Sequence, residues 1–308
     1  MDNTNHDHEI NKVLVIGLGQ LGLPVAKYVK ERAGFDTYGF DINSKAMEHA
    51  EKVALIKKIE ETTDFGKFDV FILCVSTHEA DDIFTPQIDG LLSIVEEKIS
   101  KQAKNGALVS IESTIPRGTS RKVFELLNHR LHVAHVPHRW YGLEEEEHGV
   151  KQLRVVGGVC DCCLNTATRF YSGIAGDSNT NKKNLGILLH SVSNIEIAEI
   201  TKIAENAHRY LQIAFAEDLY LYCQANNVNF ADLREAINTK WNVGILEPRD
   251  GIGEHCLPKD TKMFLQSTKS SKKSKILTAA IEVDQDYRKY IQTRCIAAQK
   301  AEQSISLI

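Results

Sequence analysis

The sequence predicts an α/β protein in which a doubly wound parallel sheet is followed by an all-helical domain built on a long central helix. Three observations support this prediction. Apolar runs of strand length alternate with helix-patterned segments over about the first 190 residues, as in folds built from strand–helix–strand units. A glycine-rich turn separates the first strand from the first helix. Beyond about residue 190 the pattern is helical.

The predicted strands are short and mostly apolar. KVLVI leads into the turn GLGQLG, and FDTYGFDIN forms a second strand that ends in an acid. FDVFILCVST and GALVSIEST have no polar–apolar alternation, which favours burial on both faces of a sheet. LHVAHVP and RVVGG are also strand-like, while LLSIVEEKISKQ and RKVFELLNHRL have the spacing of helices.

The second half of the chain is predicted to be helical. Residues 192–226 contain neither proline nor glycine and form one long helix, and FADLREAIN is a further helix. A loop rich in proline and glycine, EPRDGIGEHCLPKD, precedes two more helices, TKMFLQST and residues 275–302. We therefore predict a flexible tail at 1–10, a cofactor-binding domain at 11–190 and a helical domain at 191–308, the last carrying the cysteine loop.

Composition excludes several classes of protein. The chain has 308 residues, a net charge of 37 − 41 = −4 and 43% hydrophobic residues, which is typical of a globular protein and gives no electrostatic attraction to nucleic acid. No run approaches the ~18 apolar residues that span a membrane, and the polar N-terminus is no signal peptide. The odd count of seven cysteines favours reduced thiols and a cytoplasmic protein.

The glycine turn predicts a dinucleotide site of the Rossmann type. Gly17, Gly19 and Gly22 match G-x-G-x-x-G between a strand and a helix, where backbone N–H groups approach a pyrophosphate. Asp41 follows 41 − 22 = 19 residues later, at the end of the second strand. There it would bind ribose hydroxyls and repel a 2′-phosphate, so we expect NAD as the cofactor. The cofactor contacts in the turn are Gly17, Gly19, Gln20, Leu21 and Gly22.

Two further patterns indicate chemistry. Glu199, Lys202 and Asn206 share one face of the long helix, so a lysine and an amide one turn apart can point at a single oxygen; in isolation, a solvated helix face is the alternative. Cys256 lies in a loop with glycines and Asp260. A cysteine can attack an aldehyde, and the adduct can lose hydride to form a thioester; a structural cysteine is the alternative.

At this point the chain resembles the UDP-glucose/GDP-mannose dehydrogenases, including the UDP-N-acetylmannosamine dehydrogenases. The matching segments are GLGQLGLP at 17–24, ESTIPRGT at 112–119, RVVGG at 154–158, EITKIAENAHRYLQIAFAEDL at 199–219 and GIGEHCLPKDTK at 251–262. The resemblance implies an NAD-dependent nucleotide-sugar 6-dehydrogenase of polysaccharide biosynthesis. Such an enzyme oxidises a sugar alcohol to the carboxylate in two steps without releasing the aldehyde.

The resemblance also implies roles for single residues. Cys256 would be the nucleophile, and Lys202 and Asn206 would stabilise the alkoxide. Asp260 and Thr114 would hold and activate the water that hydrolyses the thioester. Contacts to NAD beyond the glycine turn and Asp41 would come from Val75, Ser76, Thr77, Ser113 and Thr114. Contacts to the substrate would come from His138, Arg139, Lys202, Asn206, Gly253 and Lys259.

Three departures from the family pattern matter. The family has an acid after the Pro of the segment that follows the sixth strand, whereas this chain has His138, with Glu144 to Glu147 as alternative replacements. Glu254 stands where a glycine is usual and would repel a diphosphate. Relatives carry a third domain that clamps the nucleotide, and the 308 residues hold the first two domains.

Some features and functions are weighed as alternatives. Cys160, Cys162 and Cys163 form a C-x-C-C cluster, in which we find no C-x-x-C pair and no nearby histidine that completes a tetrahedral set; we expect ordinary thiols of a surface turn and no metal. His6 and His8 lie in the tail. Rival functions are a β-hydroxyacid-type dehydrogenase of a small hydroxy acid and a non-catalytic NAD-binding partner subunit. The resemblance implies a homodimer paired through the helical domain.

Overall fold

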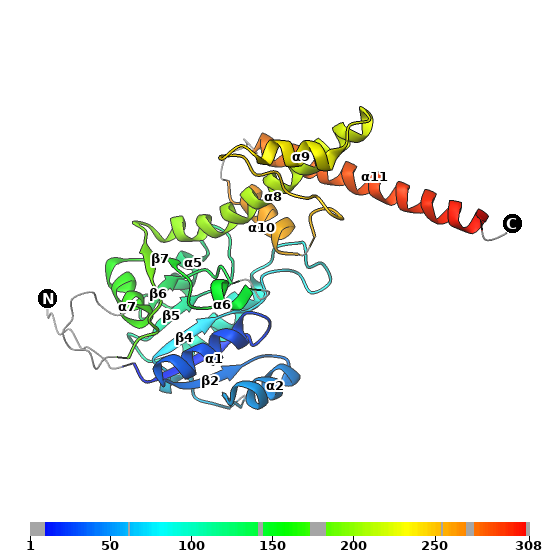
Figure 1. Cartoon of the computed structure of the whole chain (residues 1–308). Helices are drawn as coiled ribbons and strands as arrows, with labels where there is room; N and C mark the ends of the chain where they lie inside the picture. The colour runs from blue at the N-terminus through cyan, green and yellow to red at the C-terminus, as the bar shows by residue number, and fades with distance from the viewer. Residues whose placement is uncertain are drawn as a thin grey trace. The chain divides into compact units, whose positions relative to one another are not determined.

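The computed structural model of the chain (Figure 1) describes residues 10–60, 62–140, 144–172, 183–253, 255–268 and 274–305. The predicted tail therefore lies outside these residues, apart from its last position. The chain forms two compact units, one made of Met1–His78 and Gln87–Lys202, the other of Glu79–Pro86 and Ile203–Ile308. The division falls inside helix α8 (Ile195–Ala225), a little beyond the boundary near residue 190 that the sequence suggested.

The first unit is built on a sheet with the strand order β3-β2-β1-β4-β5-β6-β7-β8. From β3 to β6 every neighbouring pair is parallel, which confirms the predicted doubly wound sheet. Strand β7 departs from it, because it runs antiparallel to β6 and parallel to β8. The strands are β1 (Lys12–Ile16), β2 (Asp36–Phe40), β3 (Lys57–Lys58), β4 (Val70–Leu73), β5 (Leu108–Ile111), β6 (His132–His135), β7 (Arg154–Gly158) and β8 (Leu189–Ser191).

Both faces of this sheet are covered, which explains the continuous apolar strands. In β1, Val13 and Val15 belong to one hydrophobic cluster, while Leu14 and Ile16 belong to another. Successive strand residues point to opposite faces, so each face has its own core. The helices of this unit before α8 are α1 (Gly22–Ala33), α2 (Ser44–Ala54), α3 (Asp89–Ile94), α4 (Ser100–Gln102), α5 (Thr119–Leu126), α6 (Glu145–His148) and α7 (Asp161–Tyr171).

The second unit is helical, as predicted. It contains the remainder of α8 together with α9 (Phe230–Asn238), α10 (Cys256–Gln266) and α11 (Lys275–Ile305). Tyr220 on α8 packs edge-on against Phe230 on α9 and Tyr287 on α11, with ring centroids 5.3 and 5.6 Å apart. These aromatic contacts join three helices into one core.

One predicted boundary in this unit is wrong. The sequence placed Cys256 to Asp260 in a loop, whereas Cys256 is the first residue of α10. Pro258 favoured the loop interpretation, but proline is tolerated in the first turn of a helix, where its missing N–H has no helical partner. Among the described residues, no helix is long and apolar enough to cross a membrane.

Candidate functional site

The glycine turn after β1 is shaped by close backbone approach. Gly17 has φ +89°, and a Cβ there would lie 2.5 Å from the Cys74 carbonyl oxygen; at Gly22 a Cβ would lie 1.6 Å from the Gly17 carbonyl oxygen. A Cβ on Gly19 would meet no atom within 4 Å, and Gly19 is exposed. The fold therefore requires the first and third glycines, while the second leaves bare backbone open to a ligand at the N-terminus of α1.

Asp41 is fixed beside this turn. Its Oδ2 accepts the Leu18 backbone N–H at 2.7 Å, and its Oδ1 accepts the Asn43 N–H at 2.8 Å. Each carboxylate oxygen has a second lone pair, which suits the paired hydroxyls of a ribose. The open backbone at Gly19 and the held carboxylate together fit NAD, with Gln20 and Leu21 completing the turn.

The ends of β4 and β5 supply the next predicted cofactor residues. Ser113 is buried, and its hydroxyl lies 2.7 Å from the Val75 carbonyl oxygen and 3.2 Å from that of Leu73. Its hydroxyl therefore links the end of β5 to the end of β4 and does not offer its proton to a ligand. Thr77 is buried, whereas Ser76 is exposed and Thr114 is partly exposed, so the last two remain accessible.

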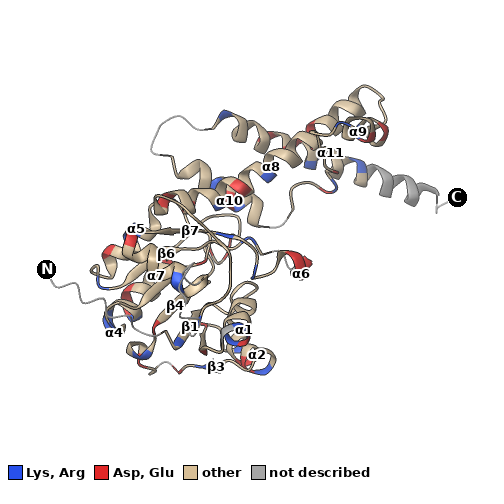
Figure 2. Cartoon of the chain, turned by 60° about the vertical axis from the view of Figure 1, so that its left-hand side comes forward, with Lys and Arg blue, Asp and Glu red and all other residues tan. Residues whose placement is uncertain are grey.

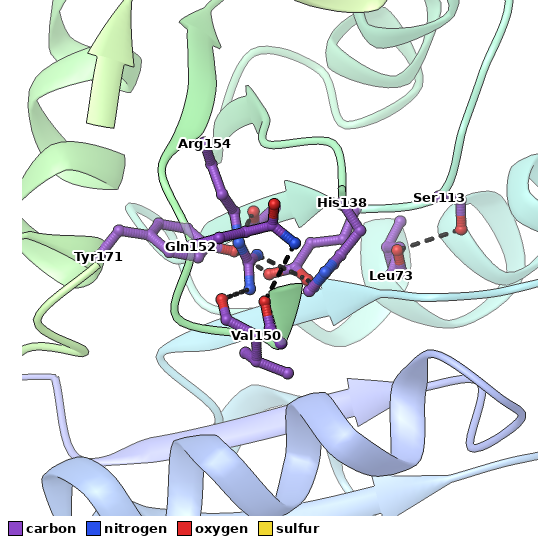
Figure 3. Close-up of polar contacts among 10 residues, drawn as sticks. Leu73, Ser113, His138, Val150, Gln152, Arg154 and Tyr171 are labelled. Atoms are coloured by element: carbon purple, nitrogen blue, oxygen red, sulfur yellow. Dashed lines mark hydrogen bonds and ion pairs between the residues drawn. The ribbon is translucent and has the colours of Figure 1, made fainter. Parts of the chain in front are cut away.

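A buried charge network lies at the same edge of the sheet (Figure 3). Glu112 follows β5 and is 1% exposed. Its Oε2 lies 3.0 Å from Arg154 Nη1, at the start of β7, and 2.5 Å from His138 Nε2, beyond the end of β6. The Tyr171 hydroxyl donates to its other oxygen. Because β7 is antiparallel to β6, its first residue lies at the edge where β5 and β6 end.

The charges of this network follow from its contacts. Burial disfavours ionisation of Glu112, but Arg154 and His138 outweigh it and lower its pKa to about 2. Burial, together with the positive charges of Arg154 and Lys202, lowers the pKa of His138 to about 4, although Glu112 opposes the shift. Near neutral pH, His138 is therefore a neutral imidazole. If its Nε2–H donates to Glu112, its Nδ1 keeps a lone pair that can accept a proton.

The sequence prediction named His138 but gave no role to Glu112, Arg154 or Tyr171. Two of these lie in quoted segments, ESTIPRGT and RVVGG. The sequence did contain a signal for this charge network, since an acid, an arginine and a histidine each adjoin an apolar strand. The alternative acids are less suitable, because Glu146 and Glu147 are exposed and Glu144 lies 3.3 Å from His148. Figure 2 shows the acidic helix α6 in red.

Glu199 has a structural role that the sequence did not reveal. Its carboxylate accepts the backbone N–H groups of Gly118 at 2.6 Å and Ser120 at 2.7 Å, at the N-terminus of α5. It therefore caps α5 and anchors the first turns of α8. Lys202 follows on the same helix and acts on His138 through its charge.

In the second unit, three predicted residues form one cluster. Asn206 Nδ2 donates to Asp260 Oδ2 at 2.5 Å, and Lys259 Nζ lies 2.7 Å from Asp260 Oδ1. Lys259 and Asp260 are 5% and 2% exposed. Cys256 is exposed and lies one turn before Asp260 on α10, so both side chains share a helix face.

A histidine that the sequence prediction left without a role adjoins the thiol. His255 Nε2 lies 3.7 Å from Cys256 Sγ. A helix N-terminus favours negative charge on a cysteine sulfur, and a neighbouring imidazole can take up its proton. The arrangement therefore suits a nucleophilic thiolate.

The loop before the thiol is held by α11. Asp284 Oδ1 accepts the Ile252 backbone N–H at 3.0 Å, and Arg288 donates to the Ile252 carbonyl oxygen. Gly251 has φ +99°, and a Cβ there would lie 3.2 Å from the Arg288 side chain. A Cβ on Gly253 would meet no atom within 4 Å. Glu254 lies outside the described residues, and Arg139 is in the first unit, with Nη1 3.3 Å from the Leu153 carbonyl oxygen.

The prediction for the cysteine cluster needs correction. Cys160 is the N-cap of helix α7, so the segment is not a simple surface turn. Cys160 and Cys163 also stand in C-x-x-C spacing. The ligand atoms of His132, Cys162 and Cys163 lie within 4.8 Å of one another. The sequence missed this histidine because it lies 30 positions before Cys162, and only the antiparallel pairing of β6 with β7 brings it to Cys162 and Cys163.

With this geometry established, comparison with known proteins is informative. Residues 11–175 match the UDP-glucose/GDP-mannose dehydrogenase family, NAD binding domain, and residues 196–286 match the central domain of the same family. The chain belongs to the UDP-glucose/GDP-mannose dehydrogenase family. Membership in this oxidoreductase family confirms the predicted resemblance and NAD as the cofactor.

Individual members of the family agree with this assignment. A UDP-N-acetyl-D-mannosamine dehydrogenase of Methanococcus maripaludis is 30% identical over 92% of this chain and 67% of its own length. One of Campylobacter jejuni is 27% identical over 92% of this chain and 74% of its own. The solved UDP-D-ManNAc dehydrogenase of Pyrococcus horikoshii superposes with a TM-score of 0.78 at 25% identity, covering 95% of this chain and 72% of that one.

Proposed function

We propose that this chain oxidises the alcohol of a UDP-sugar to the uronic acid in two NAD-dependent steps through a covalent intermediate on Cys256. The observation that carries the proposal is the position of Cys256 at the N-terminus of α10, one turn before an Asp260 that Asn206 and Lys259 hold. The named relatives support an N-acetylmannosamine-type sugar as the first substrate to test.

The thiol makes the second oxidation possible. The Cys256 sulfur forms a bond to the aldehyde carbon, and the carbonyl oxygen becomes the hydroxyl of a thiohemiacetal. Loss of hydride from that carbon and of a proton from that hydroxyl leaves a thioester. Water then adds, the carbon–sulfur bond breaks, and the carboxylic acid leaves a free thiol. NAD, when bound, accepts the hydride of each oxidation.

The other residues of the chain act on charges and protons. Lys202 and Asn206 stabilise negative charge on the sugar oxygen through an ammonium and an amide N–H. Asp260 orients the hydrolytic water, with the Thr114 hydroxyl as a second contact. Lys259 neutralises Asp260 and contacts the sugar.

His138 takes the place of the family's acid in this proposal. Its imidazole is neutral near pH 7, because burial and two cations lower its pKa to about 4. Its Nδ1 accepts a proton from the substrate alcohol or the water, while Glu112 holds the ring by Nε2. The Glu112 carboxylate then stabilises the imidazolium that forms.

We also propose that two copies pair through the helical unit. Phe215 and Tyr222 on α8 are 58% and 59% exposed, which suits an apolar contact surface on this helix. Light scattering on the purified protein is the test. The expected mass is twice that of the chain, and a monomer at micromolar concentration would contradict this part of the proposal.

The catalytic proposal is tested by counting NADH. UDP-N-acetylmannosamine, UDP-glucose and GDP-mannose are offered in limiting amounts, and two NADH per sugar consumed are expected from the productive donor. Cys256→Ser removes the thiolate nucleophile, so the rate of acid formation is expected to fall at least about 1,000-fold. Cys295→Ser, at an exposed position of α11, is the matched control and keeps full activity.

Each rival function gives a different result. One NADH per sugar, or an unchanged rate in Cys256→Ser, contradicts the two-step mechanism. Turnover of small hydroxy acids without sugar nucleotides favours the β-hydroxyacid alternative, which needs no thiol. NAD binding in calorimetry without turnover of any donor favours the partner-subunit alternative.

A further inference from the structure

The Cys160 cluster lies at the end of the sheet opposite to the cofactor turn, Glu112 and His138. Strands β6 and β7 pair antiparallel, with Ala134 opposite Gly158. Two residues further along this register, His132 at the start of β6 stands opposite Cys160. The cofactor turn, Glu112 and His138 all follow the carboxyl ends of strands, whereas this pair adjoins the amino end of β6.

Three sulfurs cluster there, and one imidazole adjoins two of them. Cys160 Sγ lies 2.8 Å from Cys162 Sγ and 3.2 Å from Cys163 Sγ. The ligand atoms of His132, Cys162 and Cys163 are mutually within 4.8 Å. The sulfur separations are too long for a disulfide bond, which requires about 2.05 Å. His132 therefore adjoins Cys162 and Cys163, and Cys160 joins the cluster through its two sulfur contacts.

Backbone N–H groups are directed at two of these sulfurs. The Val133 N–H donates to Cys163 Sγ at 3.3 Å, and the N–H groups of Cys162 and Cys163 interact with the Cys160 sulfur. The cluster also lies at the N-terminus of α7, an 11-residue helix. Backbone N–H groups directed at sulfur orient and stabilise thiolate ligands, as second-shell contacts do in metal sites.

We propose that Cys160, Cys162, Cys163 and His132 bind a structural Zn²⁺ ion in a tetrahedral Cys₃His site. Three thiolates and one imidazole are a common donor set of structural zinc, with Zn–S bonds of about 2.3 Å. Those bonds separate neighbouring sulfurs by roughly 3.8 Å, so binding would move the three sulfurs apart and bring His132 towards Cys160. The negative charge left on such a site is balanced by Arg169, which acts on His132.

The site's position indicates what the ion does. It would join the start of β6 to the junction between β7 and α7, across the one described antiparallel pair of the sheet. All four ligands come from protein, which leaves no open position for a substrate. The ion would therefore stabilise the first unit and take no part in the oxidation, so the inference is independent of the proposed function.

The first test is metal content. The full-length protein, purified without chelator, is expected to carry about one zinc per chain by elemental mass spectrometry. Cys160→Ser, Cys163→Ser and His132→Ala are each expected to lose at least about tenfold in zinc affinity. Cys295→Ser is the matched control and keeps its zinc. Full zinc occupancy in both Cys160→Ser and Cys163→Ser would overturn the proposal.

A second measurement needs no variant. Replacing zinc with Co²⁺ in the natural sequence is expected to give a thiolate-to-cobalt charge-transfer band and the intense visible bands of a tetrahedral ion. Removing the metal is expected to lower the melting temperature by more than about 5 °C. Octahedral cobalt bands, or a mass deficit of two hydrogens from a disulfide in the metal-free protein as first isolated, would overturn the proposal.

Discussion

Two buried glutamates, one in each unit, are in opposite protonation states near neutral pH. Glu112 is 1% exposed and Glu217, on α8, is 0% exposed. The pKa of Glu112 is lowered to about 2, whereas that of Glu217 is raised to about 8. Burial pushes both values upward, so the difference comes from the neighbours.

The neighbours differ in charge. Glu112 adjoins Arg154, whose cation outweighs the cost of burial. Glu217 faces a second carboxyl group, Asp284, which adds to the effect of burial and outweighs the opposing charge of Arg288. Arg288 Nε instead lies 3.0 Å from Asp284 Oδ1, so this cation contacts Asp284 directly. Equal burial thus gives an ion in one unit and a neutral acid in the other.

Glu112→Gln should have the largest effect on stability. It leaves the buried Arg154 charge unpaired, and breaking a buried pair from one side costs about 3–5 kcal/mol. Urea denaturation at pH 7 measures this loss of unfolding free energy. The relevant transition is the first one in which the sheet unfolds. Arg154→Met combined with Glu112→Gln should cost less than the sum of the single changes. Strict additivity would show that the two side chains do not act as a pair.

The next largest effect should be the change that Glu217→Gln makes in the pH dependence of the free energy of unfolding. The native chain holds the Glu217 proton up to about pH 8, whereas the unfolded chain loses it near 4.5. The natural sequence therefore loses stability from this group as pH rises between those values, by up to about 1.4 kcal/mol per pH unit. Glu217→Gln removes that loss, so its stability relative to the natural sequence should rise from pH 5 to pH 8. A difference that does not change with pH would contradict the neutral acid.

The stability difference between Glu112→Gln and the natural sequence should change with pH in the opposite direction. The folded pKa of Glu112 is lowered, so its contribution is present above about pH 4.5 and is lost as pH falls towards 2. The advantage of the natural sequence over Glu112→Gln should therefore shrink on acidification. An advantage that grows on acidification would show that Arg154 does not hold the carboxylate ionised.

The smallest effect is expected from Glu217→Gln at pH 5. Both the acid and the amide are neutral there and nearly the same size, and both can donate a hydrogen bond to Asp284. We expect a change of less than about 1 kcal/mol in the free energy of unfolding. A loss of 3 kcal/mol or more at pH 5 would mean that Glu217 is ionised even in acid.

The sequence predicts those parts of the site whose residues are close together in the chain. The glycine turn and Asp41 belong to one strand–helix–strand unit, and a local pattern was enough to place them. Glu112 with Arg154, and His132 with Cys163, meet only because β7 runs antiparallel to β6. Strand order and direction depend on packing across the whole sheet, which no local pattern contains.

The start of α10 was missed for a local reason. Pro258 and the flanking glycines favour a loop, and the helix that begins at Cys256 depends on the first turn tolerating a proline. Long, strongly patterned elements such as α8 and α11 were predicted to within a few residues. The helical interior is fixed by composition over many residues, whereas a helix start depends on one or two.

The bond between Ile252 and Asp284 has a consequence for synthesis. The two residues are 32 positions apart, and a ribosome makes the chain from its N-terminus. The thiol of Cys256 is therefore made before the helix that fixes the loop in front of it. A nascent chain passes through a stage in which the cysteine is present but its loop has no support, and the loop takes its final shape only after α11 has been translated.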